Sequence, residues 1–210
     1  MLTPQSHTRL TLVVDTNRRE TSDADLARGF IAGDPWAIAQ TWHRFAPMVL
    51  MMARRALGSK SEAEDVAQET FHRLFRKAKT LREPEKFRSF IYSFAVRTLR
   101  AELHRRKLRS WLSFDAPEAL VDIGSRSLDV ESRDLLRRFH ALLDRLTPRD
   151  RIAFTLRRME SMTVEEIAES MAISRSTVKR SIAHASDRLA RWIQADPGLA
   201  GYLDVEQLGR

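Results

Sequence analysis

From residue 23 onward, the sequence is a succession of signals that end one helix and begin the next. Gly33 is followed directly by Asp34-Pro35, the usual order of a helix stop, a helix cap and a first-turn proline. Gly58 gives a second stop, and Pro47 is expected to kink or divide the helix before it. Strand-type alternation is scarce, while the helix formers Ala, Leu, Arg and Glu dominate. The chain is therefore predicted to be all-α.

Two blocks of helical pattern are separated by a stretch without periodicity, which predicts two small helical domains joined by a flexible linker. The first domain is expected over residues 23–110 and the second over residues 135–195, where helical pattern resumes. The linker, residues 111–134, mixes Pro, Gly, Ser and scattered acids. Residues 1–22 are expected to form a loose tail, and the tail at 196–210 holds apolar residues whose role the sequence leaves open.

Two stretches have the pattern of a capping box, in which a Ser or Thr and a Glu three residues later satisfy each other's backbone amides. Ser61-Glu62-Ala63-Glu64 is expected to open a helix that reaches about Ala78. A polar loop over residues 79–85, containing Pro84, should lead into a long helix that ends near Leu108. Thr163-Val164-Glu165-Glu166 is the second box and predicts the start of a short helix.

The segment after Thr163 has the pattern of a helix-turn-helix. A short helix over residues 164–170 and a turn over residues 171–174 precede a final helix from Arg175 to Ile193. The final helix carries one apolar stripe, formed by Val178, Ile182, Ala185 and Leu189. Its N-terminal turns, the part that enters a major groove, present four polar residues outward, Arg175, Ser176, Lys179 and Arg180. An ordinary helical hairpin with a solvated basic face is the competing interpretation, and Ala172 stands where such turns commonly have Gly.

Positive charge is concentrated in two separate stretches. The formal net charge is +8, but residues 86–110 hold eight Lys/Arg and one acid, and residues 175–191 hold five Lys/Arg and one acid. In the first stretch, one helical face beside an apolar stripe that includes Phe90 collects mainly basic residues, Lys86, Ser93, Arg97, Arg100, His104 and Lys107. Taken alone, this helical face is best interpreted as a solvated charged surface. Two separate basic stretches, however, favour a polyanion held at two places over a membrane surface, which would require one amphipathic basic helix with exposed apolar anchors.

Several classes of function are disfavoured by what the sequence lacks. It has no Cys, which excludes disulfides and thiolate metal sites and fits a reducing, cytoplasmic compartment. The longest apolar run, from Phe45 to Ala53, is too short to cross a bilayer, and no export leader is expected. A metal-dependent nuclease using Glu62, Asp65 and Glu69 is an alternative that the spacing does not support, since these acids share one helix. We therefore expect no cofactor, no metal, no membrane insertion and no catalytic site.

Three groups of motifs occur in a fixed order. The first is Glu64-Asp65-Val66-Ala67-Gln68-Glu69-Thr70-Phe71, and the second spans residues 87–95 with Arg105-Arg106 beyond. The third comprises Leu146-Thr147-Pro148-Arg149, Glu166-Ile167-Ala168 and residues 174–179. Together they resemble bacterial RNA polymerase sigma factors of the extracytoplasmic-function group of the sigma-70 family. In that family the corresponding segments hold the polymerase clamp, melt and read the −10 element, and read the −35 element.

The resemblance implies a non-enzymatic initiation factor whose partners are core RNA polymerase and promoter DNA. Polymerase docking is then expected at Asp65, Gln68 and Glu69. Contacts to the −10 single strand are expected at Lys86, Phe90, Arg97, Arg100, His104 and Lys107. Contacts to the −35 duplex are expected at Arg175, Ser176, Lys179 and Arg180. The sequence departs from the family where Phe90 replaces a usual Trp, and where Arg97 and Ala101 replace a usual Asn and Asp.

The 24-residue linker matters to this interpretation, because it would reach about 80 Å when extended. That length spans two major-groove sites about 70 Å apart. An anti-sigma factor is left open as a further partner. The alternative function is that of a helix-turn-helix regulator that acts without core polymerase, with residues 24–110 as a dimerising or effector domain.

Overall fold

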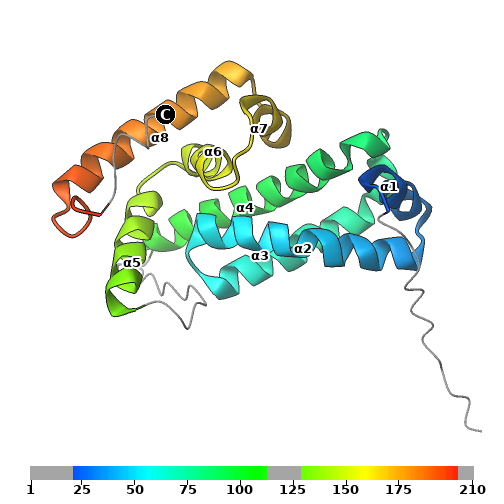
Figure 1. The fold of residues 1–210 in the computed structure, drawn as a ribbon, viewed down its shortest axis with the longest axis horizontal. Coiled ribbons are helices and arrows are strands. Elements are labelled where there is room, and N and C mark those ends of the chain that lie inside the picture. Colours follow the sequence, from blue (N-terminus) through cyan, green and yellow to red (C-terminus); the bar gives the residue numbers. More distant parts are fainter. Residues whose placement is uncertain (1–20, 113–128, 203–210) are drawn as a thin grey trace, which may run out of the picture.

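The computed structural model describes residues 21–112 and 129–202, and that part of the chain contains helices and no strands. A first group comprises α1 (Asp23–Ala32), α2 (Pro35–Leu57), α3 (Lys60–Arg76) and α4 (Phe87–Leu112). A second group comprises α5 (Val130–Asp144), α6 (Pro148–Arg158), α7 (Val164–Met171) and α8 (Arg175–Ala195). The predicted all-α fold with two helical domains, the second a helix-turn-helix, is confirmed (Figure 1). Residues 113–128 of the predicted linker and most of both predicted tails lie outside the described residues.

The first group is built around aromatic side chains. In Figure 1, α2, α3 and α4 run alongside one another and α1 crosses one end. Phe87 is fully buried, with its ring centroid 5.2 Å from that of Phe30 and 5.5 Å from that of Phe45. Gly33 and Gly58 adopt the left-handed conformation that ends α1 and α2, as their positions predict. Asp34 caps α2 through the Trp36 amide, with Pro35 in the first turn.

Two details of the first group correct the prediction. Pro47 does not divide α2, which continues to Leu57; the ring is exposed, where water can replace the missing helical hydrogen bond. The predicted capping box at Ser61 is wrong, because Ser59 is the N-cap of α3 and accepts from the Glu62 amide at 3.4 Å. Gly58 already ends α2, so only Gly58 and Ser59 separate the two helices, and Ser61 and Glu64 fall inside α3.

The segment between α3 and α4 is more ordered than the predicted polar loop. It contains two short 3-10 turns, Ala78–Thr80 and Pro84–Lys86, around the buried side chain of Leu81. The long helix α4 therefore starts at Phe87, directly after the second turn, and it extends to Leu112 rather than ending near Leu108. Proline in the first 3-10 position and the apolar anchor at Leu81 account for the difference.

In the second group, the helix-turn-helix matches its prediction closely. Thr163 and Glu166 form the expected capping box at the start of α7, with both reciprocal hydrogen bonds present. Ala172 adopts the left-handed conformation at φ 54°, so an alanine does occupy the position where Gly was expected. By contrast, α5 begins at Val130, before the predicted start near Leu135, because Asp129 caps it through the Ser132 amide. The C-terminal tail starts against this group, where Leu199 is buried.

The two groups pack directly against each other. Helices α6 and α7 lie on α4, and α6 also contacts α2 (Figure 1). One cluster of buried apolar side chains is continuous across the boundary, from Ile91 and Leu99 of α4 to Leu156 of α6 and Ile167 of α7. A second, smaller cluster joins α5, α6 and α8 around Leu189. This contact between the domains was not predicted from the sequence.

Candidate functional site

Helix α4 presents a basic face to solvent along most of its length. Arg97, Arg100, His104 and Lys107 are exposed, while Ile91, Phe94 and Thr98 on the opposite side are buried. Within the described residues, neither Arg100 nor His104 makes a hydrogen bond or an ion pair with another side chain. Because these two side chains are not committed to the protein, their donors remain available to an anionic ligand.

The N-terminal half of the same face is partly occupied by local contacts. Arg97 donates to the Ser93 hydroxyl at 2.9 Å and to the Ser93 carbonyl at 3.0 Å, and its guanidinium lies 4.9 Å from the Phe94 ring centroid. The half-buried Phe90 ring lies 5.0 Å from the ring of Phe94. Lys86 donates to Glu83, whose carboxylate raises the pKa of the Lys86 ammonium. Aromatic rings and an arginine on one surface suit unpaired bases, on which they stack.

The start of α8 forms the second basic surface. Ser174 caps the helix through the Thr177 amide at 3.2 Å, and Val178, Ala185 and Leu189 bury the opposite side. The four predicted readout residues, Arg175, Ser176, Lys179 and Arg180, are all exposed. Arg175 pairs with Glu165 at 3.3 Å, but both side chains are largely exposed, so this pair contributes little and is easily exchanged for a phosphate or a base. Such a surface has the shape and donors that a major groove accepts.

The exposed side of α3 carries the three residues predicted to dock polymerase. Asp65 and Gln68 are exposed and, within the described residues, make no side-chain hydrogen bond or ion pair. Glu69 instead accepts from Arg73 at 2.5 Å and is only half exposed. Beside Gln68, α2 and α3 enclose a hollow of about 320 Å³ lined by Trp42, Pro47 and Leu50. The exposed Trp42 was not singled out from the sequence, because its accessibility depends on how α2 meets α3.

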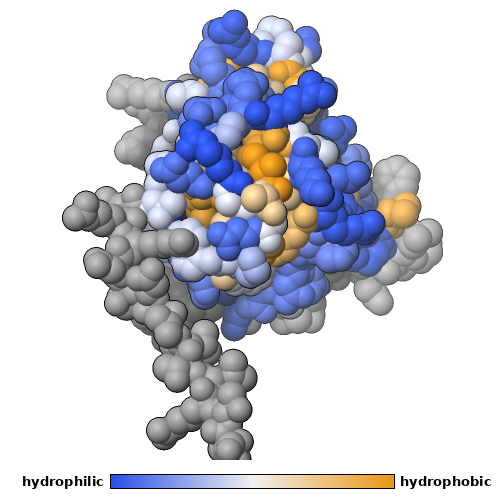
Figure 2. Space-filling model, turned by 90° about the vertical axis from the view of Figure 1, so that its right-hand side faces the viewer, coloured by the Kyte–Doolittle hydropathy of each residue, from blue (hydrophilic) through white to orange (hydrophobic). Residues whose placement is uncertain are grey.

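A second hollow lies at the end of the molecule where α1 crosses the bundle. Its volume is about 310 Å³, its walls include Phe30, Ile38 and Phe75, and its rim carries cations, Arg76, Lys77 and Lys79. Figure 2 views this end and shows apolar side chains exposed between hydrophilic ones. This hollow was not predicted from the sequence, although residues 76–82 contain four cations.

Two other kinds of site are absent from the described residues. No helix there is long and apolar enough to span a bilayer. No group of three or more His, Asp or Glu side chains in residues 21–112 and 129–202 is placed to hold a metal ion. Glu62 and Glu69, two of the acids of the nuclease alternative, instead pair with arginines.

Comparison with protein families yields two matches. Residues 41–109 match the model described as Sigma-70 region 2, and residues 136–189 match that described as Sigma-70, region 4. The first match contains α3 and nearly all of α4, and the second contains α6, α7 and the start of α8. All three candidate surfaces therefore lie within matched segments.

Individual relatives agree with the family models. The chain is 28% identical over 189 residues to the ECF RNA polymerase sigma factor SigM of Mycobacterium tuberculosis, covering 90% of this chain and 89% of that protein. It is 31% identical over 135 residues to the ferric citrate uptake sigma factor FecI of Escherichia coli, covering 62% of this chain and 76% of FecI. Among solved structures, the sigma factor RpoE of Bartonella quintana, bound to the anti-sigma factor NepR, shares the fold. Its TM-score is 0.58, with 19% identity over 75% of this chain and 97% of RpoE.

Proposed function

The chain belongs to the extracytoplasmic-function group of sigma-70 RNA polymerase sigma factors, and we propose how its two helical groups divide the work of that function. A sigma factor binds core RNA polymerase and directs promoter recognition and transcription initiation. The alternative of a regulator that acts without polymerase is wrong, because most of its supposed effector domain matches sigma-70 region 2. The factor has no catalytic site of its own and works in the cytoplasm, where polymerase is.

Polymerase docking is assigned to the exposed side of α3. Asp65 and Gln68 lie three residues apart on one helical face and have no partner within the described residues, which leaves their oxygens and amide available. Trp42 and the hollow beside Gln68 supply apolar area next to these polar groups. Glu69 contributes less to polymerase docking, since Arg73 already neutralises its charge.

DNA recognition is divided between α4 and α8. The basic face of α4, with Phe90, Arg97, Arg100, His104 and Lys107, holds the separated −10 strand, and Lys86 joins it by giving up its pair with Glu83. Arg175, Ser176, Lys179 and Arg180 read the −35 duplex. The single observation that carries this division is the presence of two exposed basic surfaces on different helical groups. The anti-sigma complex of the Bartonella relative supports an anti-sigma factor as a further partner.

A pair of substitutions with opposite effects tests the division. Asp65→Arg should lower affinity for core polymerase by about 2–5 kcal/mol, because it places a like charge against a basic surface of the partner. The melting temperature of the isolated protein should hardly change, since Asp65 is exposed and unpaired within the described residues. Lys179→Ala should keep core affinity and cost about 1–3 kcal/mol in promoter binding.

The measurement is an anisotropy titration of each variant with core enzyme, followed by run-off transcription on promoters with and without a −35 element. Asp187→Arg on the exposed side of α8 makes the same change of charge and serves as the control for core affinity. If Asp65→Arg binds core polymerase as tightly as this control, α3 is not the docking helix.

A further inference from the structure

The hollow at the end of the molecule where α1 crosses the bundle has a rigid aromatic wall. We call it the α1–α3 hollow, because its lining residues come from α1, α2, α3 and the turns that follow α1 and α3. The Phe75 ring centroid lies 5.8 Å from that of Phe71 and 5.9 Å from that of Phe30. Phe30 in turn lies 5.2 Å from Phe87. Because these rings hold one another in place, the wall is formed before any ligand binds.

The size and lining of the α1–α3 hollow are those of a site for a small organic molecule. Its volume of about 310 Å³ is at the lower end of the range of ligand pockets, roughly 300–1,000 Å³. Ile31, Ile38 and Phe75 are only half-buried there, and Figure 2 shows apolar side chains exposed at this end. A Cβ added at Gly33 would meet no heavy atom within 4 Å, so the hollow is open on that side. An aromatic body of one or two rings fits such a space.

Cations surround the mouth of the hollow and are not neutralised by the chain. Arg76, Lys77 and Lys79 are exposed and, within the described residues, make no side-chain hydrogen bond or ion pair. No Asp or Glu is among the residues that line the hollow. The negative end of the α3 dipole favours a cation at Arg76 and at the C-cap Lys77. It does not account for Lys79, which lies beyond the helix in a 3-10 turn. Together these charges create a positive potential that attracts an anion.

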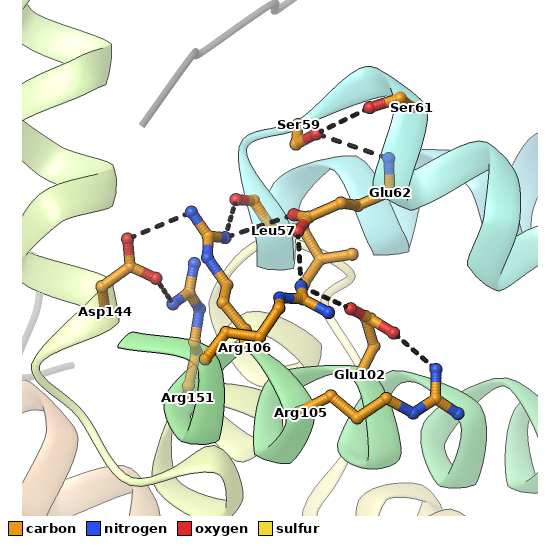
Figure 3. Close-up of polar contacts among 10 residues, drawn as sticks. Leu57, Ser59, Ser61, Glu62, Glu102, Arg105, Arg106, Asp144 and Arg151 are labelled. Atoms are coloured by element: carbon orange, nitrogen blue, oxygen red, sulfur yellow. Dashed lines mark hydrogen bonds and ion pairs between the residues drawn. The ribbon is translucent and has the colours of Figure 1, made fainter. Parts of the chain in front are cut away.

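The carboxyl end of α2 shows how cations at a helix end are satisfied within this chain. Arg151 of α6 donates to the Ala56 carbonyl at 2.5 Å, and Arg106 of α4 donates to the Leu57 carbonyl at 2.7 Å. The Asp144 carboxylate lies between the two arginines and pairs with both (Figure 3). Oxygens of the protein thus occupy these donors. The cations at the carboxyl end of α3 have no such partner within the described residues, which leaves their donors to an external anion.

The α1–α3 hollow is separate from the surfaces that were assigned to polymerase and DNA. No residue of α4 or α8 lines it, so it lies outside both DNA-reading surfaces. It also shares no residue with the hollow beside Gln68, which has a similar volume of about 320 Å³. The lining of that other hollow includes Glu64 and no Lys or Arg. An anion is therefore attracted to the α1–α3 hollow and repelled from the one beside Gln68.

We propose that the α1–α3 hollow binds a small amphipathic anion, an aromatic carboxylate or sulfonate, with its rings against Ile38 and Phe75 and its anionic group held by Lys77 and Lys79. The rings would cover apolar surface that is exposed without the ligand. The anionic group would accept charge-assisted hydrogen bonds from the ammonium groups. The inference does not rest on the proposed function, because none of these residues is assigned to polymerase or DNA.

Fluorescence titration with anilinonaphthalene sulfonate tests the part played by charge. This probe has an aromatic body and one sulfonate, and its fluorescence rises in apolar surroundings. Lys79→Glu should weaken its binding about fivefold, because one attractive charge at the mouth becomes repulsive. Arg82→Glu is the matched control, since Arg82 is exposed in the same segment but does not line the hollow. Equal losses of affinity in the two variants would show that only the net charge of the chain matters and would overturn the proposal.

Phenylnaphthylamine, which has the same rings without the sulfonate, measures what the anionic group adds. It should bind the parent protein about tenfold more weakly than the sulfonate, because it has no charge to pair with the cations. If it binds as tightly as the sulfonate and responds equally to Lys79→Glu, the hollow selects for rings alone and the assignment to an anion is wrong.

Filling the hollow tests where the probe binds. Ala78 is half-buried in the lining, so Ala78→Phe places a ring in the space that the probe needs and should abolish most of the binding. Ala39→Phe makes the same exchange at an exposed position of α2 outside the hollow and should leave the affinity unchanged. Melting curves check that both variants fold. If the folded Ala78→Phe variant binds the probe as tightly as Ala39→Phe, the probe binds elsewhere and the proposal fails.

A single-stranded oligonucleotide with the −10 sequence distinguishes a small ligand from the promoter strand as the occupant. Added in excess to the isolated protein, it should leave the sulfonate probe bound, because no residue of α4 lines the hollow. Displacement of the probe would assign the hollow to DNA and overturn the assignment to a small anion. Run-off transcription by the parent protein with core polymerase tests the proposed function separately, and its outcome does not affect the probe titrations.

Discussion

The interiors of the two helical groups differ in kind. The first buries aromatic rings against one another, with Phe30, Phe71 and Phe87 all at or below 1% exposure. The second buries Asp150, Arg151 and several hydroxyl side chains among its aliphatic residues. Burial alone would raise the pKa of Asp150, but the hydrogen bond with His184 at 2.9 Å and the nearby hydroxyls of Thr147 and Ser181 outweigh burial and lower that pKa. The first group is therefore held by non-directional packing, and the second by directed polar contacts, one of which reaches across to α2.

The largest effect should come from opening the aromatic interior. Phe87→Ala removes a ring that touches Phe30 and Phe45, and should lower the free energy of unfolding by about 3–5 kcal/mol. Phe90→Ala removes the same side chain from a half-exposed position and should cost only about 1 kcal/mol. Urea denaturation of both variants measures the difference. Equal losses would mean that the first group does not depend on its buried rings.

The free energy of unfolding should depend on pH through the buried His140 of α5. Burial, and then the nearby Arg151, lower the pKa of His140 to about 4. The folded form thus binds a proton less readily than the unfolded form with a pKa near 6.5, so stability is complete above pH 6.5 and falls as the pH drops toward 4. Between pH 7 and pH 5 the loss should be about 2 kcal/mol. Melting curves of the parent and of His140→Leu measure it: the variant should lose most of this pH dependence, whereas His43→Leu at an exposed position should keep it.

A smaller effect distinguishes the two serines at the start of α3. Ser59→Ala removes the observed N-cap and should cost about 1 kcal/mol. Ser61→Ala changes an exposed residue inside the helix and should alter stability by no more than a few tenths of a kcal/mol. Thermal melting of the two single variants measures this difference in stability. A larger loss of stability in Ser61→Ala than in Ser59→Ala would support the capping box that was predicted from the sequence.

The smallest effect concerns the turn of the helix-turn-helix. Ala172→Gly should stabilise the second group by about 0.5–1 kcal/mol, because Gly adopts the left-handed conformation without the steric cost that Ala has there. Ala183→Gly, at an exposed position within α8, should instead destabilise by about 1 kcal/mol. Opposite signs in the two melting curves would confirm that backbone strain, rather than glycine itself, produces the gain.

Local features of the fold could be predicted wherever neighbouring residues determine them. Thr163 with Glu166, and the left-handed Ala172, lie within a few residues of the partners that define them. The start of α3 was misplaced because Ser59 and Ser61 are equally good caps in isolation, and only the end of α2 at Gly58 decides between them. The exposed residues of α4 and α8 were found because helical periodicity separates them from an apolar stripe.

The contact between the domains could not be predicted in this way. Arg106 and Arg151 look like two more cations in a basic chain, and in the sequence nothing separates them from the exposed Arg97 and Arg180. Their partners include carbonyl groups, which every residue has, and those partners lie 49 and 95 residues away. Helical patterns reveal which side of a helix is covered, but not which other helix covers it.

The use of main-chain carbonyls as arginine partners has a consequence for how this contact would evolve. Exchanging the side chain of Ala56 or Leu57 leaves the carbonyl in place, so a change on α2 requires no matching change at Arg151 or Arg106. Paired substitutions, the usual record of spatial contact in related sequences, would therefore not reveal these two hydrogen bonds. The contact is instead sensitive to length: inserting or deleting one residue in the last turn of α2 rotates its terminal carbonyls by about 100° and moves them away from both arginines.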